Sequence, residues 1–191
     1  MEILPIKKRF RGFLPVVVDI ETSGFNAKTN AILEISAVTL YMDHDKKLHL
    51  KDTHMFHVEP FKSAELDVKS LEFNKIDPHH PFRFALPETE VFTTLFKLIR
   101  DEIKLNECNR AVMVAHNPAF DLGFMQAALK RCEIIKDPFH PFTTFDTATL
   151  GGIAFGQTVL ARACESAGIS FDTKEAHSAK YDAEKTAELF C

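Results

Sequence analysis

The chain has 191 residues, which is within the usual size of a single domain. Hydrophobic residues make up 46% and charged residues 26%, so the composition excludes disordered, collagen-like and disulfide-framework classes. The net charge of −4 argues against wholesale non-specific binding of nucleic acid. A protein with this net charge can still carry a local basic patch.

The first half of the chain predicts three strands joined by turns. Residues 16–20 form a β-branched apolar run that is typical of a buried strand, and Gly24 and Asn26 then indicate a turn. The next elements are expected in this order: strands at 31–41 and 48–58 around a hairpin loop at 43–45, a short helix at 64–73, and a Pro- and His-rich loop at 74–87.

The second half alternates helices with strands. Apolar spacing predicts a helix over 87–104, and 111–115 is typical of another buried strand. Pro118 suits the first turn of a helix, and Gly168 suits the position after one. Helices are expected at 118–132, 159–167 and 178–190. This order indicates one α/β domain with a mixed sheet over residues 1–191. Because the last helix has no stop signal before Cys191, we expect the natural chain to continue.

The cellular setting follows from what the sequence lacks. No apolar run approaches the roughly 18 residues of a membrane span. Residues 1–12 place a short apolar stretch before basic residues, which is the reverse of a secretory signal. No two cysteines form a CxxC pair, which argues against a zinc or redox site. We therefore expect a cytoplasmic protein with reduced thiols and no membrane partner.

Asp19 and Glu21 are candidate metal ligands. They are two apart on a predicted strand, so their side chains point to the same side. Adjacent carboxylates repel each other and ionise together readily when a cation lies between them, and such oxygen ligands suit Mg²⁺ or Mn²⁺. About one D-x-E is expected by chance, and a second pair, Asp182 and Glu184, occurs in a helical setting where the side chains diverge.

Two further acidic residues are candidates with open alternatives. Asp121 follows a buried strand where a helix begins, a common place for ligands, but a first-turn carboxylate there also suits the helix dipole alone. Asp182 lies five residues after His177, which on a loop near carboxylates would be a natural general base. His116 stands at the same spacing from Asp121, so spacing leaves open which histidine is the base.

Three segments in this order resemble the DEDDh family of 3′→5′ exonucleases: Asp19-Ile-Glu21-Thr22, Asn117-Pro-Ala-Phe-Asp121 and His177-Ser-Ala-Lys-Tyr-Asp182. Other segments, over nearly the whole chain, are similar to one RNA-trimming branch of that family: Phe10-Arg-Gly-Phe, 21–29, 56–61, 73–78 and 138–146. The resemblance implies an RNase H-like α/β fold, with a mixed five-stranded sheet flanked by helices.

The resemblance also implies a two-metal hydrolysis of phosphodiester bonds with two Mg²⁺, for which Mn²⁺ can substitute. One ion would lower the pKa of the attacking water, and the other would stabilise the leaving 3′ oxygen. By analogy His177, and not His116, would accept the proton of that water. The implied ligands are Asp19, Glu21 and Asp182 for the first ion and, for the second, Asp19 with support from Asp121.

The aromatic composition gains a meaning from the same resemblance. The chain has 18 Phe, 2 Tyr and no Trp. In the RNA-trimming branch, aromatic side chains stack on the terminal bases of a single strand, at about 1–3 kcal/mol per base and with any sequence. The matching residues, expected at loops or element ends, are Phe25, Phe73, Phe120 and Phe142. We expect Phe10, Phe13, Phe92 and Phe96 in the core.

Enzymes of that branch act as homodimers, in which a basic surface of one subunit guides RNA to the active site of the other. The positions carried over are Arg9, Arg11, Lys104 and Arg110. The resulting hypothesis is a 3′→5′ exoribonuclease that trims 3′ ends of structured RNA such as tRNA, digests single-stranded DNA and releases nucleoside 5′-monophosphates. One alternative is a proofreading-type DNA exonuclease, against which the phenylalanines argue. Another is a catalytically silent module that binds 3′ ends, against which the complete catalytic set argues.

Overall fold

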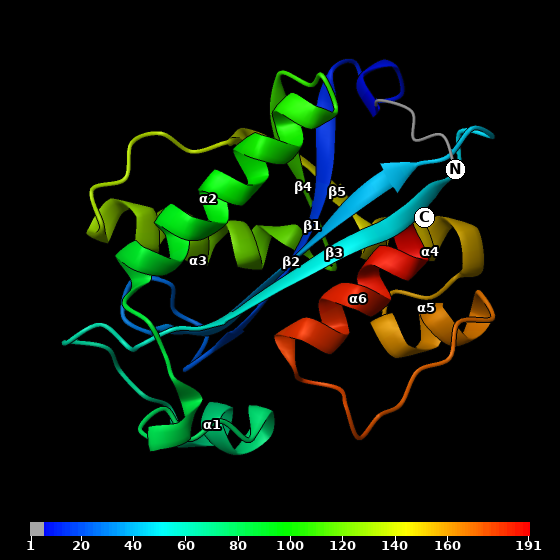
Figure 1. Cartoon of the computed structure of the whole chain (residues 1–191). Coiled ribbons are helices and arrows are strands. Elements are labelled where there is room, and N and C mark those ends of the chain that lie inside the picture. Colours follow the sequence, from blue (N-terminus) through cyan, green and yellow to red (C-terminus); the bar gives the residue numbers. More distant parts are fainter. Residues whose placement is uncertain (1–5) are drawn as a thin grey trace.

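The centre of the fold is a mixed sheet of five strands in the order β3-β2-β1-β4-β5 (Figure 1). The computed structural model describes residues 6–191, so the first five residues of the segment considered above for a secretory signal lie outside it. β1 pairs antiparallel with β2 and parallel with β4; β2 and β3 are antiparallel, and β4 and β5 are parallel. The strands are β1 (Phe13–Thr22), β2 (Ile32–Met42), β3 (Leu48–His57), β4 (Arg110–Ala115) and β5 (Phe139–Asp146). This arrangement confirms the expected mixed five-stranded sheet.

Helices cover both faces of the sheet. Figure 1 shows α2 and α3 over one face, α4, α5 and α6 over the other, and α1 beyond one end of the sheet. Because β1 and β4 lie inside the sheet between helical layers, their apolar residues are buried on both faces. The helices are α1 (Val68–Asn74), α2 (Glu88–Leu105), α3 (Pro118–Arg131), α4 (Thr147–Phe155), α5 (Leu160–Ser166) and α6 (Ala179–Phe190), with 3₁₀ turns at Ile6–Lys8 and Pro81–Arg83.

Most predicted elements are confirmed within two residues of their bounds. The exceptions are β1, which was expected from residue 16 and begins at Phe13, and α1, which was expected from residue 64 and begins only at Val68. Asp67 is its N-cap, since the Asp67 carboxylate accepts hydrogen bonds from the backbone N–H groups of Lys69 and Ser70. A helix that has such a cap does not extend further toward the N-terminus.

Two elements, β5 and α4, were missed in the sequence. Strand β5 contains Pro141, which cannot donate a ladder hydrogen bond and is tolerated here because β5 is an edge strand. Helix α4 contains the helix-weakening pair Gly151 and Gly152. At Gly151 the reason is packing: an added Cβ would lie 2.9 Å from the backbone oxygen of Gln157.

The core contains Phe92 and Phe96 as expected, while Phe10 and Phe13 are only partly buried. The four cysteines are free thiols, as expected. Among residues 6–191, no helix combines the length and the apolar character that crossing a bilayer requires.

Candidate active site

Asp19 and Glu21 lie near the carboxyl end of the central strand β1, with their side chains on the same face. In the antiparallel pairing with β2, Asp19 is opposite Ser36 and Glu21 is opposite Glu34. A β-branched apolar run explains the strand, and the two carboxylates interrupt it where it reaches the edge of the core. The predicted pair is therefore held by the central strand of the sheet.

Asp121 reaches the same region from the first turn of α3. The backbone of Asn117 is left-handed, with φ of 68°, and its N–H donates to Asp146 Oδ1 at 3.0 Å. Pro118 then begins the helix, as predicted. The side chain of Asp121 is buried, and this burial raises its pKa to about 8. A carboxylate that served only to interact with the helix dipole could do so from an exposed position, so burial of Asp121 indicates a further role.

His177 and Asp182 come from the loop before α6 and from the first turns of that helix. The N–H of His177 donates to Asp182 Oδ2 at 3.0 Å, and His177 is left-handed with φ of 68°. The His177 ring centroid lies 4.1 Å from that of Phe73. Three potential ligand atoms lie within 4.8 Å of one another, one each from Glu21, His177 and Asp182. The structure thus brings together two of the three predicted motifs directly.

The electrostatics show a site with excess negative charge. Burial raises the pKa of Asp19, and the charges of Asp121, Glu21 and Asp182 raise it further. Burial and then the charge of Asp182 raise the pKa of Glu21 to about 8. Because each carboxylate disfavours ionisation of the others, a cation among them would be strongly favoured.

The donor set fits a hard divalent cation. Asp182 Oδ1 is buried and has no hydrogen-bond partner among the described residues, so one carboxylate oxygen is left for a ligand. Oxygen atoms of Asp and Glu are the ligands that Mg²⁺ and Mn²⁺ prefer, and no cysteine takes part.

His116 has a different place from His177. Its Nδ1 lies 3.0 Å from Thr147 Oγ1, and its Nε2 lies 2.8 Å from the backbone oxygen of Thr158. With both ring nitrogens engaged, His116 joins the end of β4 to α4 and to the segment after it. Of the two histidines at this spacing, His177 is the exposed one whose ring lies with Glu21 and Asp182.

Aromatic side chains line a pocket beside these carboxylates. The pocket has a volume of about 420 Å³ and is lined by Phe25, Phe73 and Phe120 together with Glu21. Their exposed fractions are 86%, 62% and 36%, respectively, and the rings of Phe25 and Phe120 are 6.3 Å apart. These three phenylalanines are not core residues, so a role in binding planar groups fits them.

Phe142 is as exposed as predicted, at 79%, but its position differs from expectation. It lies inside the edge strand β5 and not at a loop or element end, and it does not line the pocket. Phe120, by contrast, lies at an element end as expected, in the first turn of α3. The sequence did not indicate the strand because Pro141 precedes Phe142.

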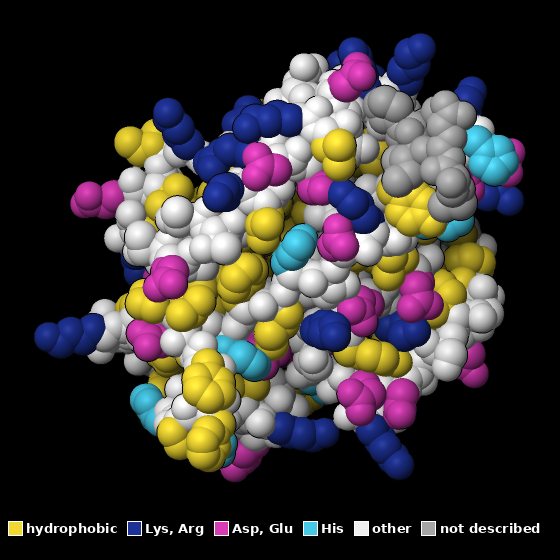
Figure 2. Space-filling model, in the orientation of Figure 1, with side chains coloured by type: hydrophobic (Ala, Val, Ile, Leu, Met, Phe, Trp, Pro, Cys, Tyr) yellow, Lys and Arg dark blue, Asp and Glu magenta, His cyan; other side chains and the backbone are white. Residues whose placement is uncertain are grey.

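The four basic residues gather at the other end of the sheet. Arg110 begins β4 and pairs with Phe13 at the start of β1, about 20 Å along that strand from Asp19. Figure 2 shows Lys and Arg side chains along the upper part of the molecule, where Figure 1 places the start of β1 and the end of α2. The others are Arg9 and Arg11, which precede β1, and Lys104, which is in the last turn of α2 and whose Nζ lies 3.4 Å from Asp101 Oδ1.

Sequence reasoning missed several polar residues around the site. Glu34 is buried beside Glu21, and buried Asn74 donates from Nδ2 to the backbone oxygen of Thr22 at 3.0 Å. Asp146 holds the backbone of Asn117 through the hydrogen bond described above. Glu34 carries a signal that could have found it, since it is a charged residue within an apolar β-branched run, as Asp19 is.

Comparisons with known proteins agree with this geometry. A family model named RNase_T and described as exonuclease matches residues 16–190. The chain is 60% identical over 191 residues to ribonuclease T of Vibrio parahaemolyticus, covering all of this chain and 89% of the relative. It is 56% identical over 187 residues to ribonuclease T of Hahella chejuensis, covering 98% of this chain and 86% of the relative.

The fold is similar to that of solved exonuclease structures. Escherichia coli exonuclease I in complex with a dT13 oligonucleotide matches with a TM-score of 0.70 at 14% identity. The match covers 93% of this chain and 40% of that one, so this chain spans about two fifths of the length of exonuclease I. At this identity the similarity concerns the RNase H-like fold.

Proposed function

Since the chain belongs to the RNase_T exonuclease family and is a hydrolytic 3′→5′ exoribonuclease, we propose that it trims single-stranded 3′ ends of structured RNA such as tRNA and also digests single-stranded DNA. The observation that carries the proposal is the convergence of Glu21, His177 and Asp182 beside an aromatic pocket. Carboxylates and a histidine serve the hydrolysis, and the pocket takes the terminal nucleotides.

The carboxylates Asp19, Glu21, Asp121 and Asp182 would hold two divalent ions, Mg²⁺ or Mn²⁺. Such ions supply a more acidic attacking water and neutralise charge on the phosphate that is cleaved. The protein holds these carboxylates on the end of a central strand and on two helix starts, so they keep their places before any substrate binds.

His177 would accept the proton of the attacking water. It is exposed, and its backbone N–H is fixed by Asp182, so its ring is available to solvent next to the carboxylates. Hydrolysis then adds the water oxygen to phosphorus and breaks the bond to the 3′ oxygen, which leaves with a proton. The product is a nucleoside 5′-monophosphate, and the chain is one nucleotide shorter.

The phenylalanines would stack on the last bases of the strand. Phe25, Phe73 and Phe120 face one pocket, and stacking tolerates every base. Phe142, on the edge strand β5, would contact the strand further from its end. A pocket of about 420 Å³ has room for unpaired nucleotides and not for a continuous duplex, so the enzyme would stop near paired regions.

The basic residues support action as a homodimer. Arg110 lies beside the start of β1, about 20 Å along that strand from Asp19, which is too far to orient the reacting phosphate within one subunit. In a dimer, the same surface would guide the RNA body toward the partner's pocket through salt-dependent phosphate contacts. We propose that this activity takes place in the cytoplasm.

A cleavage assay on a 5′-labelled RNA hairpin with a single-stranded 3′ tail tests the proposal. The wild-type protein should shorten the tail stepwise with Mg²⁺ and not with EDTA, and stall near the duplex. Asp19→Asn should remove cleavage, whereas Glu165→Gln, at an exposed site on α5, should retain it. If the wild-type protein binds the hairpin without shortening it, the chain is a silent 3′-end-binding module. If it degrades a recessed 3′ end of a DNA duplex as readily as the single-stranded RNA tail, a proofreading enzyme is favoured.

A further inference from the structure

Glu34 occupies the middle of a row of side chains that crosses three strands. It is opposite Glu21 on β1 and opposite His57 on β3, so the three side chains share one face of the sheet. Helix α6 packs across these strands on that face. A buried carboxylate beside another carboxylate is costly unless it has partners, and so the partners of Glu34 explain its presence.

The first partner is the start of α6. The N–H of Ala179, the first residue of the helix, donates to Glu34 Oε2 at 3.4 Å. The N-cap residue itself, Ser178, makes no side-chain cap hydrogen bond. Glu34 therefore satisfies from the sheet a helix N–H that an N-cap side chain usually satisfies, and its charge is favoured by the positive end of the helix dipole.

The other partners are cationic or can become so. His57 Nδ1 lies 3.2 Å from Glu34 Oε1. Burial lowers the pKa of Arg83, and the nearby Glu34 carboxylate opposes this effect. Arg83 in turn donates from Nη2 to the backbone oxygen of Leu33 at 2.6 Å, next to Glu34 in the chain. Glu34 Oε2 thus accepts from Ala179 and Oε1 lies beside His57, while the Glu34 charge also raises the pKa of the neighbouring Glu21.

We infer that Glu34 is a positioning residue, whose carboxylate fixes the start of α6 and thereby the places of Asp182 and His177 relative to Glu21. Asp182 lies in the first turns of α6 and holds the backbone of His177, so a shift of the helix start moves both groups. The effect on catalysis rests on the proposed function, whereas the effect on the helix does not.

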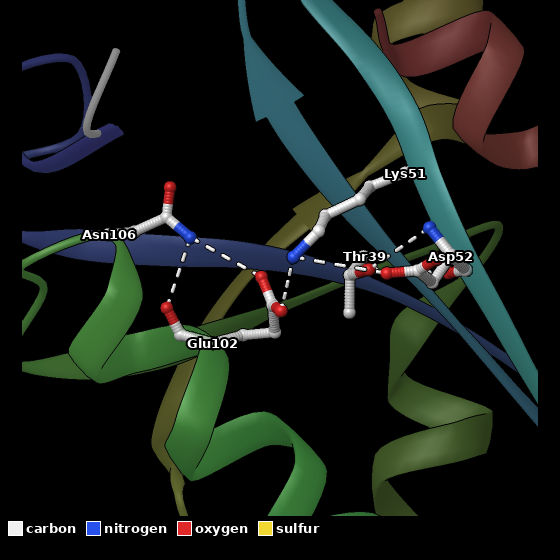
Figure 3. Close-up of polar contacts among 5 residues, drawn as sticks. All are labelled: Thr39, Lys51, Asp52, Glu102 and Asn106. Atoms are coloured by element: carbon white, nitrogen blue, oxygen red, sulfur yellow. Dashed lines mark hydrogen bonds and ion pairs between the residues drawn. The ribbon is translucent and has the colours of Figure 1, made fainter. Parts of the chain in front are cut away.

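Two substitutions separate positioning from metal binding. Glu34→Ala removes the acceptor, and Glu34→Gln keeps an oxygen that can accept from Ala179. Glu102 provides a matched control, because its side chain is 15% exposed against 11% for Glu34, and it is also ion-paired. Figure 3 shows that Glu102 on α2 contacts Lys51 and Asn106, in a cluster that contains no site residue.

The first readout is single-turnover cleavage of the tailed hairpin over a range of Mg²⁺ concentrations. Glu34→Ala should lower the maximal rate about 100-fold, the loss that a small misplacement of catalytic groups produces, with RNA binding little changed. Glu34→Gln should recover most of the rate, and Glu102→Ala should match the wild type. If Glu34→Gln loses as much rate as Glu34→Ala, the negative charge and not the cap is what matters, and the inference is overturned.

The second readout is hydrogen exchange of residues 178–183 without metal or substrate. Loss of the cap should make exchange at this helix start about fivefold faster in Glu34→Ala than in the wild type or Glu34→Gln. Unchanged exchange would overturn the inference. If Glu34→Ala does not fold, Glu34→Met, which has a similar volume and no acceptor, replaces it in both assays. A wild-type chain that exchanges as expected but cleaves no RNA would count against the proposed function alone.

Discussion

Replacing Asp121 by Asn should stabilise the metal-free protein while removing its activity. Asp121 is 4% exposed, and burial raises its pKa to about 8. In the unfolded chain the same carboxyl titrates near its ordinary pKa of about 4. Between these values the folded protein holds a proton that the unfolded chain has released, so stability is full below about pH 4 and falls as pH rises toward about 8. A neutral amide of the same size avoids this loss.

The magnitude follows from the shift in pKa. A shift of about 4 units at 1.36 kcal/mol per unit corresponds to an upper bound of about 5 kcal/mol well above pH 8. At pH 7 most of that loss, about 4 kcal/mol, has already occurred. Asp19 shares the titration, because its pKa is also raised, so we expect Asp121→Asn to recover about half, or about 2 kcal/mol. For a chain of this length that corresponds to about 4–8 °C in Tm.

Thermal unfolding in EDTA at pH 5, 7 and 9 measures this effect. The Tm of the wild type should fall with pH more steeply than that of Asp121→Asn, and the variant should be the more stable protein at pH 7 and 9. Asp101→Asn, at an exposed carboxylate, controls for the general loss of one negative charge. Added Mg²⁺ should raise the Tm of the wild type more than that of Asp121→Asn, since a ligand stabilises only the protein that binds it.

Two results would refute the reasoning. If Asp121→Asn is no more stable than the wild type at pH 9, then burial of this carboxylate costs the fold nothing. If the difference in Tm is present but equal at pH 5 and pH 9, it arises from packing or hydrogen bonding and not from a proton held by the folded state.

Three further predictions concern the substrate. Phe25→Ala should weaken binding of a single-stranded 3′ tail about tenfold in EDTA, measured by fluorescence anisotropy, whereas Phe155→Ala on α4 should not; equal losses would remove the case for stacking. His177→Gln should lower the single-turnover rate at least about 100-fold at unchanged RNA binding, and a retained rate would assign the base elsewhere. Double replacement of Arg11 and Arg110 by Ala should reduce by about 2 the slope with which the logarithm of the RNA-binding constant falls with the logarithm of salt concentration. Mixing this variant with Asp19→Asn chains should restore activity if the basic surface of one subunit serves the active site of the other.

The elements that could be predicted from the sequence are those whose pattern is local. The buried run at 16–20 and the helical spacing at 87–104 specify their own structure, so α2 begins and ends within one residue of expectation and β1 contains the whole expected run, although it begins three residues earlier. Asp19 and Glu21 also form a local pattern, because the two-residue period of a strand places them together.

The rest of the site depends on contacts between distant segments. Asp121 and Asp182 reach β1 from two different helices, and spacing within the chain says nothing of that approach; a family resemblance supplied it. Glu34 becomes significant only in the cross-strand register with Glu21 and His57. Strand β5, which contains Phe142, was missed because an edge strand needs no alternating apolar pattern.

The division of the site between a central strand and a loop has a consequence for motion. Asp19 and Glu21 lie on β1, which has two neighbours in the sheet, and such a strand opens only with the unfolding of the whole domain. His177 lies on an exposed loop with a left-handed backbone, next to the exposed ring of Phe73. Local fluctuations can therefore move His177 and the ring of Phe73 while the carboxylates stay in register. A nucleotide product could leave, and the shortened strand advance, without the two β1 carboxylates being displaced.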